Sequence, residues 1–406
     1  MKFVYIKGQE KLKHLYFLVW LGLIYLLVSS CTKDHLDPAL PDLSGEGKEE
    51  VPAEVSIAAI DDDMVAFMAR FNVPGASIAI SRHGKLVYAK GYGVADRESG
   101  DKVDTASLFR IASLSKFITS VGIMTLIDKG KLSMNDKVFG PGAILGTEYG
   151  TQPYPQYITD ITLKNMLQHE IGGWNNSSGD PAFQQTSLGI EALISWTIDN
   201  RPLSAKPGTK LDYSNIGYLI LGRIIEKVSG QPYDTFIKNE VLAKVGVKNM
   251  KIAGGALEDR QPNEVKYYGQ NGMNPYGYAP GVIPRLDACG GWIASAIDYL
   301  RIMVHADGFT SVPDILSPST ITLMSTPSTN SVYACGIRIS KISKNWWHGG
   351  GISGTRTWMV RASNGFAWTI FFNTWTTDEG FDDAVDELIW PAVNNSATQW
   401  PDVDLF

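Results

Sequence analysis

Sequence typical of β-strands occurs near both ends of the 406-residue chain, and the region between them carries helical patterns. Apolar and small side chains alternate over residues 76–81, and a second strand pattern over residues 86–93 completes a predicted hairpin. Near the other end, residues 355–361 and 366–373 flank Asn364-Gly365, the strongest short hairpin signal. The apolar residues expected on one face of the last strand are Phe366, Trp368, Ile370 and Phe372. These patterns predict a sheet assembled from the two ends of the chain.

Helical patterns fill the middle of the chain. Apolar residues recur at helical spacing after Ser113, over residues 190–198 and over residues 217–228. We therefore expect an α/β (α+β) domain over residues 56–395, with its reaction site where the sheet and the helices meet. Its expected parts are an antiparallel sheet flanked by helices from about residues 56–105 and 275–395, an all-helical insert over about residues 106–274, and a tail over residues 396–406. Further expected elements are a helix with Asp61, Asp62 and Asp63 in its first turn, a strand over residues 333–340 and a closing helix over about residues 381–390.

The composition argues against several classes of function. The net charge is −6, and no long cluster of lysine and arginine occurs outside the leader, which disfavours nucleic acid as a partner. The histidines show neither His-x-His nor His-Glu-x-x-His spacing, so a zinc hydrolase lacks its ligands. No Gly-x-Ser-x-Gly elbow and no Walker or dinucleotide glycine pattern occurs. We expect neither a metal nor an organic cofactor.

The N-terminus has the order of a secretory leader. Lysines precede an apolar run over residues 15–28, which is too short for an ordinary membrane span of roughly 20 residues. Val28-Ser29-Ser30-Cys31 resembles a bacterial lipoprotein processing box, which implies a signal peptide over residues 1–30 and lipidation of Cys31. The alternative is an uncleaved membrane anchor. Either way, we expect the domain in the cell envelope, on the periplasmic or outer-surface side of a bacterial membrane.

Two features follow from this expected export. Residues 31–55 are acidic, rich in proline and glycine and poor in large apolar side chains, so they predict a disordered tether. Cys289 and Cys335 would then lie in a compartment that permits disulfides. Their spacing leaves open whether they form a disulfide or are two separate buried thiols.

Ser113 and Lys116 form the first candidate catalytic pattern. Residues three apart on a helix are neighbours, so the serine and lysine share a face at the N-terminal end of the expected helix. The helix N-terminus also favours developing negative charge, which suits a nucleophile in acyl transfer. The alternative is a helix cap followed by an unrelated lysine. Because Ser30 and Lys33 repeat the spacing within the leader, support must come from other motifs.

Two further motifs give that support. Tyr213-x-Asn215 precedes one predicted helix, and His348-Gly349-Gly350 precedes the predicted strand over residues 355–361. In this order the motifs resemble the serine β-lactamase and penicillin-binding-protein superfamily, in particular its class C β-lactamase-like branch of esterases and D-peptidases. Weaker similarity is found in the segment that ends at Trp174 and in the Gly-Gly segment before Asp298.

The resemblance implies a role for each motif residue. Ser113 would be the nucleophile, with Lys116 and Tyr213 as a coupled general base, either of which could take the serine proton. The N–H groups of Ser113 and Gly351 would form the oxyanion hole. The residues implied to bind substrate are Asn215, His348, Gly349, Gly350 and Trp174. The alternatives are that Tyr213 and Asn215 form a turn and cap, that His348 is a polar residue at a strand start, and that Trp174 only packs.

We therefore predict an exported serine hydrolase that forms an acyl-enzyme with a small-molecule or peptide ester or amide, including peptidoglycan-like or β-lactam substrates. His348 stands where many β-lactamases have lysine, which removes a fixed positive charge and favours an esterase or peptidase. Two alternatives remain: a penicillin- or peptide-binding protein that is acylated without turnover, and a surface scaffold that retains only the fold. The oligomeric state is left open.

Overall fold

A computed structural model describes residues 54–406, which belong to one compact unit of the chain. The expected signal peptide, the lipidation site Cys31 and nearly all of the expected tether lie outside the described residues. Among the described residues, no helix has both the length and the apolar character needed to cross a bilayer.

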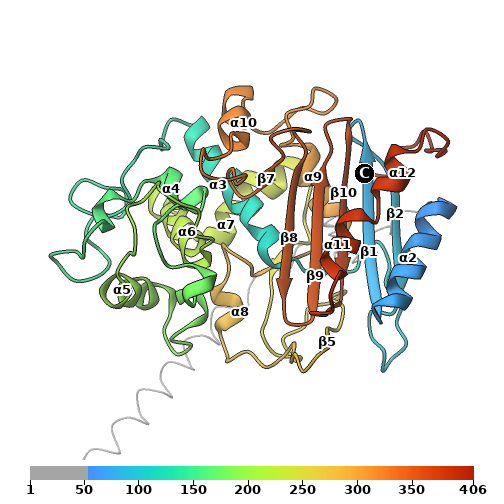
Figure 1. The fold of residues 1–406 in the computed structure, drawn as a ribbon, viewed down its shortest axis with the longest axis horizontal. Helices are drawn as coiled ribbons and strands as arrows, with labels where there is room; N and C mark the ends of the chain where they lie inside the picture. Colours follow the sequence, from blue (N-terminus) through green and yellow to red (C-terminus); the bar gives the residue numbers. More distant parts are fainter. Residues whose placement is uncertain (1–53) are drawn as a thin grey trace, which may run out of the picture. The chain divides into compact units, whose positions relative to one another are not determined.

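The centre of the described unit is a six-stranded antiparallel sheet in the order β2-β1-β10-β9-β8-β7. The strands are β1 (Gly75–Arg82), β2 (Lys85–Gly93), β7 (Arg338–Ile339), β8 (Trp346–Ile352), β9 (Thr355–Arg361) and β10 (Phe366–Phe372). β1 lies beside β10, with Ile78 opposite Ile370 (Figure 1). Both predicted hairpins are confirmed, and the two ends of the chain do form one sheet.

Alternating side chains on β10 divide the core between the two faces of the sheet. Phe366, Trp368, Ile370 and Phe372 share one apolar cluster with residues of α2 (Ala58–Arg70), α11 (Phe381–Glu387) and α12 (Trp390–Asn394). Phe371 faces the other way, against α9 (Ala296–Val304) and Phe109. Burying a large apolar side chain contributes about 1.5–3 kcal/mol to folding stability. The alternation therefore determines which face of the sheet each layer of helices covers. The predicted one-sided placement is confirmed.

Helices fill most of the middle of the chain, as expected (Figure 1). The α-helices here are α3 (Ser115–Asp128), α4 (Leu163–Leu167), α5 (Ile190–Asn200), α6 (Asn215–Ser229), α7 (Tyr233–Ile237) and α8 (Val282–Arg285), and α10 (Pro318–Ser325) follows later. Short strands are β3 (Phe109–Arg110), β4 (Lys251–Ile252), β5 (Tyr268–Gly269), β6 (Trp292–Ala294) and β11 (Thr374–Trp375). α3 packs against both α6 and α10, so the helix after Ser113 is buried on several sides.

Five local predictions need correction. The insert is not all-helical, because β3, β4 and β5 lie within residues 106–274 and pair with β6 or β11 from later in the chain. α2 begins at Ala58, so only Asp61 of the three aspartates lies in its first turn. The expected strand over residues 333–340 is reduced to β7, because Gly336 has a left-handed backbone (φ 74°) and a tight turn joins Ala334 to Ile337. The expected closing helix is interrupted after Glu387, and α12 starts just before Pro391, which has no N–H for a continuous helix. Ser113 lies in a 3₁₀ turn (Ala112–Leu114) before α3, not in the α-helix itself.

Candidate active site

Ser113 is held at the junction of β3 and α3. The preceding Ala112 has a left-handed backbone (φ 46°), which is unusual for a residue with a side chain. Thr355 and Thr357 on β9 donate hydrogen bonds of 2.9 Å to the carbonyls of Arg110 and Ile111. The sheet therefore fixes the segment that presents Ser113 to an open cavity of about 520 Å³.

Lys116 is buried directly beneath Ser113. Its Nζ lies 3.2 Å from Ser113 Oγ and donates 2.7 Å hydrogen bonds to Asn215 Oδ1 and to the carbonyl of Cys289. Burial lowers the pKa of Lys116 below the ordinary 10.5, because a desolvated ammonium is disfavoured. The neutral amine that a general base requires is therefore more accessible here than on a surface lysine.

Tyr213 lies on the other side of the same pair. Lys116 Nζ lies 5.0 Å from the centre of its ring, and the Ser113 side chain lies close enough to its hydroxyl to affect the pKa of the phenol. Burial raises the pKa of Tyr213 above its ordinary value, so the phenol stays protonated at neutral pH. Both shifts favour the neutral form of the side chain relative to the same group in water.

The glycine run on β8 lies against the serine. Within the described residues, β8 pairs with β7 only at Trp346 and Trp347, which leaves the rest of this strand edge without a strand partner on that side. A Cβ on Gly350 would overlap the Ile111 carbonyl and lie 3.1 Å from the backbone nitrogen of Ser113. Gly351 lines the same cavity as Ser113. An oxyanion hole made by the N–H groups of Ser113 and Gly351 stays a prediction.

His348 and Trp174 do not line the cavity in the part of the chain that the structure describes. His348 is only 2% exposed, and its ring lies 6.2 Å from the Tyr213 ring. Burial lowers its pKa to about 3, so the imidazole is neutral. Trp174 is buried and donates from Nε1 to the carbonyl of Arg201 at 2.6 Å. Direct contact of either side chain with substrate stays a prediction that this geometry does not support.

Asp180 is a site residue that sequence reasoning missed. Its carboxylate accepts hydrogen bonds from the backbone N–H of Asn215 (2.5 Å) and Ile216 (3.2 Å), and from Asn215 Nδ2 (3.2 Å). It therefore caps α6 and holds the Asn215 amide with Oδ1 toward Lys116. In the sequence, Asp180-Pro181 is typical of a helix start. That pattern predicts the short turn over Pro181–Phe183 but not the contact of Asp180 with α6.

Arg285 on α8 is the second residue that was missed. Its guanidinium is buried and donates 2.7–3.0 Å hydrogen bonds to four carbonyls of one loop. The four acceptors belong to Ala182, Gln184, Gln185 and Leu188. Because this loop carries Phe183 and Gln184 into the cavity wall, Arg285 fixes one side of the cavity.

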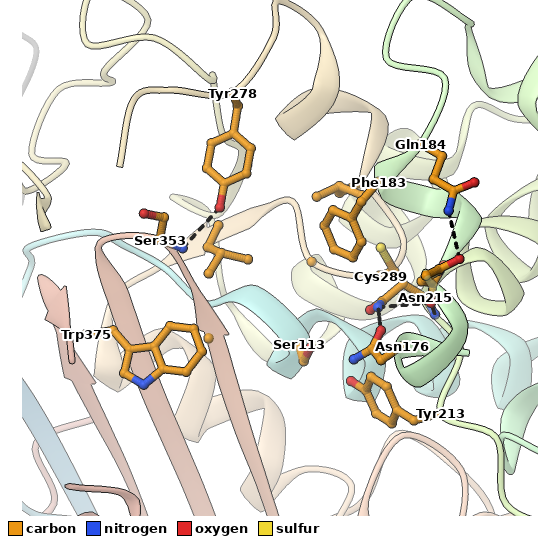
Figure 2. A pocket seen from close by; sticks show the side chains of 16 residues that line it. Ser113, Asn176, Phe183, Gln184, Tyr213, Asn215, Tyr278, Cys289, Ser353 and Trp375 are labelled. Atoms are coloured by element: carbon orange, nitrogen blue, oxygen red, sulfur yellow. Dashed lines mark hydrogen bonds between the residues drawn. The ribbon is translucent and has the colours of Figure 1, made fainter. Parts of the chain in front are cut away.

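An open cavity of about 520 Å³ surrounds Ser113 (Figure 2). Its apolar and aromatic walls come from Phe183, Tyr278, Leu286, Ile352 and Trp375. Its polar groups include Asn176, Asp180, Gln184, Tyr213, Asn215 and Ser353. Of the residues predicted to bind substrate, Asn215 lines this cavity, and Gly349 and Gly350 lie on β8 next to Gly351.

The two cysteines are separate buried thiols in the described part of the chain. Cys289 lines the cavity and its carbonyl holds Lys116, and burial raises the pKa of its thiol to about 12. A thiol that resists ionisation is a poor nucleophile.

Among the described residues, His, Cys, Asp and Glu form no group of three or more that could hold a metal ion.

The fold, together with Ser113 at the cavity beside the buried Lys116, is typical of serine hydrolases related to β-lactamases. The family model described as "Beta-lactamase" matches residues 60–389. The chain belongs to the beta-lactamase family, whose members include serine hydrolases acting on amides and esters.

Individual relatives agree with this assignment. Protein flp of Staphylococcus aureus (strain N315) is 31% identical over 171 residues, which cover 42% of this chain and 33% of that protein. The alignment thus spans about a third of the length of that relative. The octameric penicillin-binding protein homologue from Pyrococcus abyssi has a TM-score of 0.67 at 22% identity and covers 83% of this chain and 77% of its own. D-amino acid amidase from Ochrobactrum anthropi SV3 has a TM-score of 0.67 at 20% identity, with coverages of 83% and 98%.

Proposed function

We propose that this protein is a serine hydrolase that cleaves an ester or amide through an acyl-enzyme at Ser113. Ser113 Oγ attacks the substrate carbonyl while its proton passes to the neutral amine of Lys116, directly or through the Tyr213 hydroxyl. The N–H groups of Ser113 and Gly351 stabilise the oxyanion. The bond to the leaving group breaks, and that group takes up the proton. Water then attacks the acyl-enzyme, which releases the acid and restores the Ser113 hydroxyl.

The observation that carries the proposal is the placement of Lys116. A buried lysine with Nζ 3.2 Å from a serine hydroxyl, at the base of an open cavity, provides a base, a nucleophile and access for substrate together. A surface scaffold needs none of these features. The beta-lactamase family assignment supports the same chemistry.

The proposal is tested by intact-mass detection of a covalent adduct with a fluorophosphonate, which transfers its phosphonyl group to an activated serine and releases fluoride. We expect one adduct on the native protein and none on Ser113→Ala. Ser353→Ala is the matched control, because Ser353 lines the same cavity and should not be required for labelling. Absence of any adduct on the native protein would reject the hydrolase, and an adduct that persists on Ser113→Ala would place the nucleophile elsewhere.

A second candidate is a binding protein that is acylated but does not turn over, which the similarity to the Pyrococcus abyssi penicillin-binding protein homologue favours. Treatment with a penicillin, followed by removal of free reagent, separates the two. Loss of the adduct over time indicates turnover. A penicillin adduct that persists for hours, without hydrolysis of simple esters, favours the binding protein.

We also propose that Cys31 is lipidated and that the protein is anchored in the bacterial cell envelope. The support is the order of lysines, apolar run and Val28-Ser29-Ser30-Cys31 in the sequence. We expect Cys31→Ala to move the protein from the membrane fraction to the soluble fraction, because a lipidated anchor is lost. Cys335→Ala, which changes a buried thiol of the domain, should stay in the membrane fraction. Membrane retention of Cys31→Ala would contradict lipidation.

A further inference from the structure

We infer that the cavity selects substrates that are uncharged on both sides of the scissile bond and discriminates against substrates with a carboxylate there. The inference rests on the proposed function, because it concerns the substrate of the same Ser113 site. It follows from the charges around the cavity and from its walls.

Lysine, arginine and histidine are absent from the cavity lining in the described part of the chain. The one carboxyl group in the lining is Asp180, which is only 4% exposed and accepts three hydrogen bonds from Asn215 and Ile216. A substrate carboxylate would therefore meet no fixed positive charge in the wall. It would lose hydration without gaining an ion pair, which is unfavourable.

The nearest lysine has no free donor for a substrate. As a neutral amine Lys116 has two N–H donors and one lone pair, and its three neighbours are Asn215 Oδ1, the Cys289 carbonyl and Ser113 Oγ. A carboxylate could recruit Lys116 only by displacing one of these bonds. Displacing the bond to Ser113 would also remove the base from its nucleophile.

Arg285, Arg338 and Arg356 lie outside the cavity lining. Arg285 donates to four loop carbonyls, and Arg338 lies over the Tyr333 ring at 4.7 Å. Arg356 stacks against Trp375 at 5.6 Å and forms a two-bond pair with Asp382, at 2.8 and 2.7 Å. Its charge is therefore balanced by a carboxylate of the protein. Arg356 is a cation next to the cavity, since a Cβ at Gly351 would lie 3.2 Å from its Nη1, and a substrate carboxylate there would have to compete with Asp382.

The walls offer apolar surface on both sides of Ser113 (Figure 2). On one side Tyr278 and Trp375 face the cavity together with Ser353, and on the other side Phe183 lies near Asn176 and Gln184. The first side suits an aromatic or aliphatic group, and the second suits an apolar group that carries an amide. The cavity thus fits a neutral amide-bearing ester, thioester or amide.

The test uses two thioesters that differ by one charge. Both carry an N-phenylacetyl-glycyl acyl group, and the leaving thiol is methyl thioglycolate in one and thioglycolate in the other. At pH 7 the second leaving group has an ionised carboxylate. After correction for their rates of hydroxide hydrolysis, we expect kcat/KM to be at least about tenfold higher for the methyl ester. A ratio near one, or a preference for the carboxylate, would overturn the inference.

A gain-of-charge variant provides the reciprocal test. Ser353→Arg adds a cation to the wall, and we expect it to shift the ratio toward the carboxylate substrate by about fivefold or more. Ser353→Gln is the control for size and should leave the ratio close to native. A Ser353→Arg ratio equal to that of Ser353→Gln would count against electrostatic selection. Fluorophosphonate labelling separates this inference from the proposed function. If Ser113 forms no adduct, the proposed hydrolase itself is refuted. If Ser113 is labelled but the enzyme prefers the carboxylate, or cleaves neither thioester, only the substrate inference is refuted.

Discussion

Lys116→Met is expected to lower kcat/KM for an activated ester by about 10³-fold, within the usual range for loss of a general base. Methionine nearly fills the volume of the lysine side chain, but it cannot take the proton of Ser113, which lies 3.2 Å from Nζ in the native protein. Steady-state hydrolysis of a p-nitrophenyl ester measures the effect. Urea unfolding of the variant establishes that the loss does not come from an unfolded protein.

The same prediction has a pH dependence. The unprotonated amine is the active form, so kcat/KM should rise as pH increases through the pKa of Lys116. Because burial lowers this pKa, the rise should be centred below 10.5, the ordinary lysine value. The rise should disappear in Lys116→Met and persist in Lys131→Met, a variant of an exposed lysine beyond the end of α3. An unchanged profile in Lys116→Met would assign the base to another group.

Gly350→Ala is expected to reduce kcat/KM by about 100-fold and to destabilise the fold by about 1–3 kcal/mol. The added Cβ would overlap the Ile111 carbonyl and the Thr357 hydroxyl, so β8 must move away from Ser113. Overpacking of this kind usually destabilises a core by that amount, and a displacement of about 1 Å at a reacting centre can lower the rate 100-fold. Urea unfolding and ester hydrolysis measure the two effects.

Gly255→Ala is the control for this substitution. A Cβ at Gly255 would lie 3.7 Å from its nearest neighbour, on Ile283, which is an ordinary contact. We expect it to change stability by less than about 1 kcal/mol and to leave the activity intact. If Gly350→Ala matched Gly255→Ala in both measurements, close packing of β8 against Ser113 would not be required for activity.

Local patterns predicted much of the fold because they depend on neighbouring residues. The alternation over residues 366–373 places Phe366 and Trp368 on one face, and Asn364-Gly365 joins that strand to β9. The prediction failed over residues 333–340, where the left-handed Gly336 interrupts an otherwise strand-like pattern. The closing helix was predicted too long. Pro391 interrupts it because proline has no backbone N–H, and the apolar pattern does not show this interruption.

The sequence by itself determined the family, since the order of Ser113-x-x-Lys116, Tyr213-x-Asn215 and the glycine run can be recognised without a structure. Only the tertiary structure decided that Asp180 and Arg285 support the site and that Trp174 is buried away from the cavity. These contacts join loops and helices distant in the chain, and no periodic pattern marks them. The environment of Lys116 was decided in the same way, because its low dielectric and its hydrogen bonds exist only once the helices and the sheet are packed together.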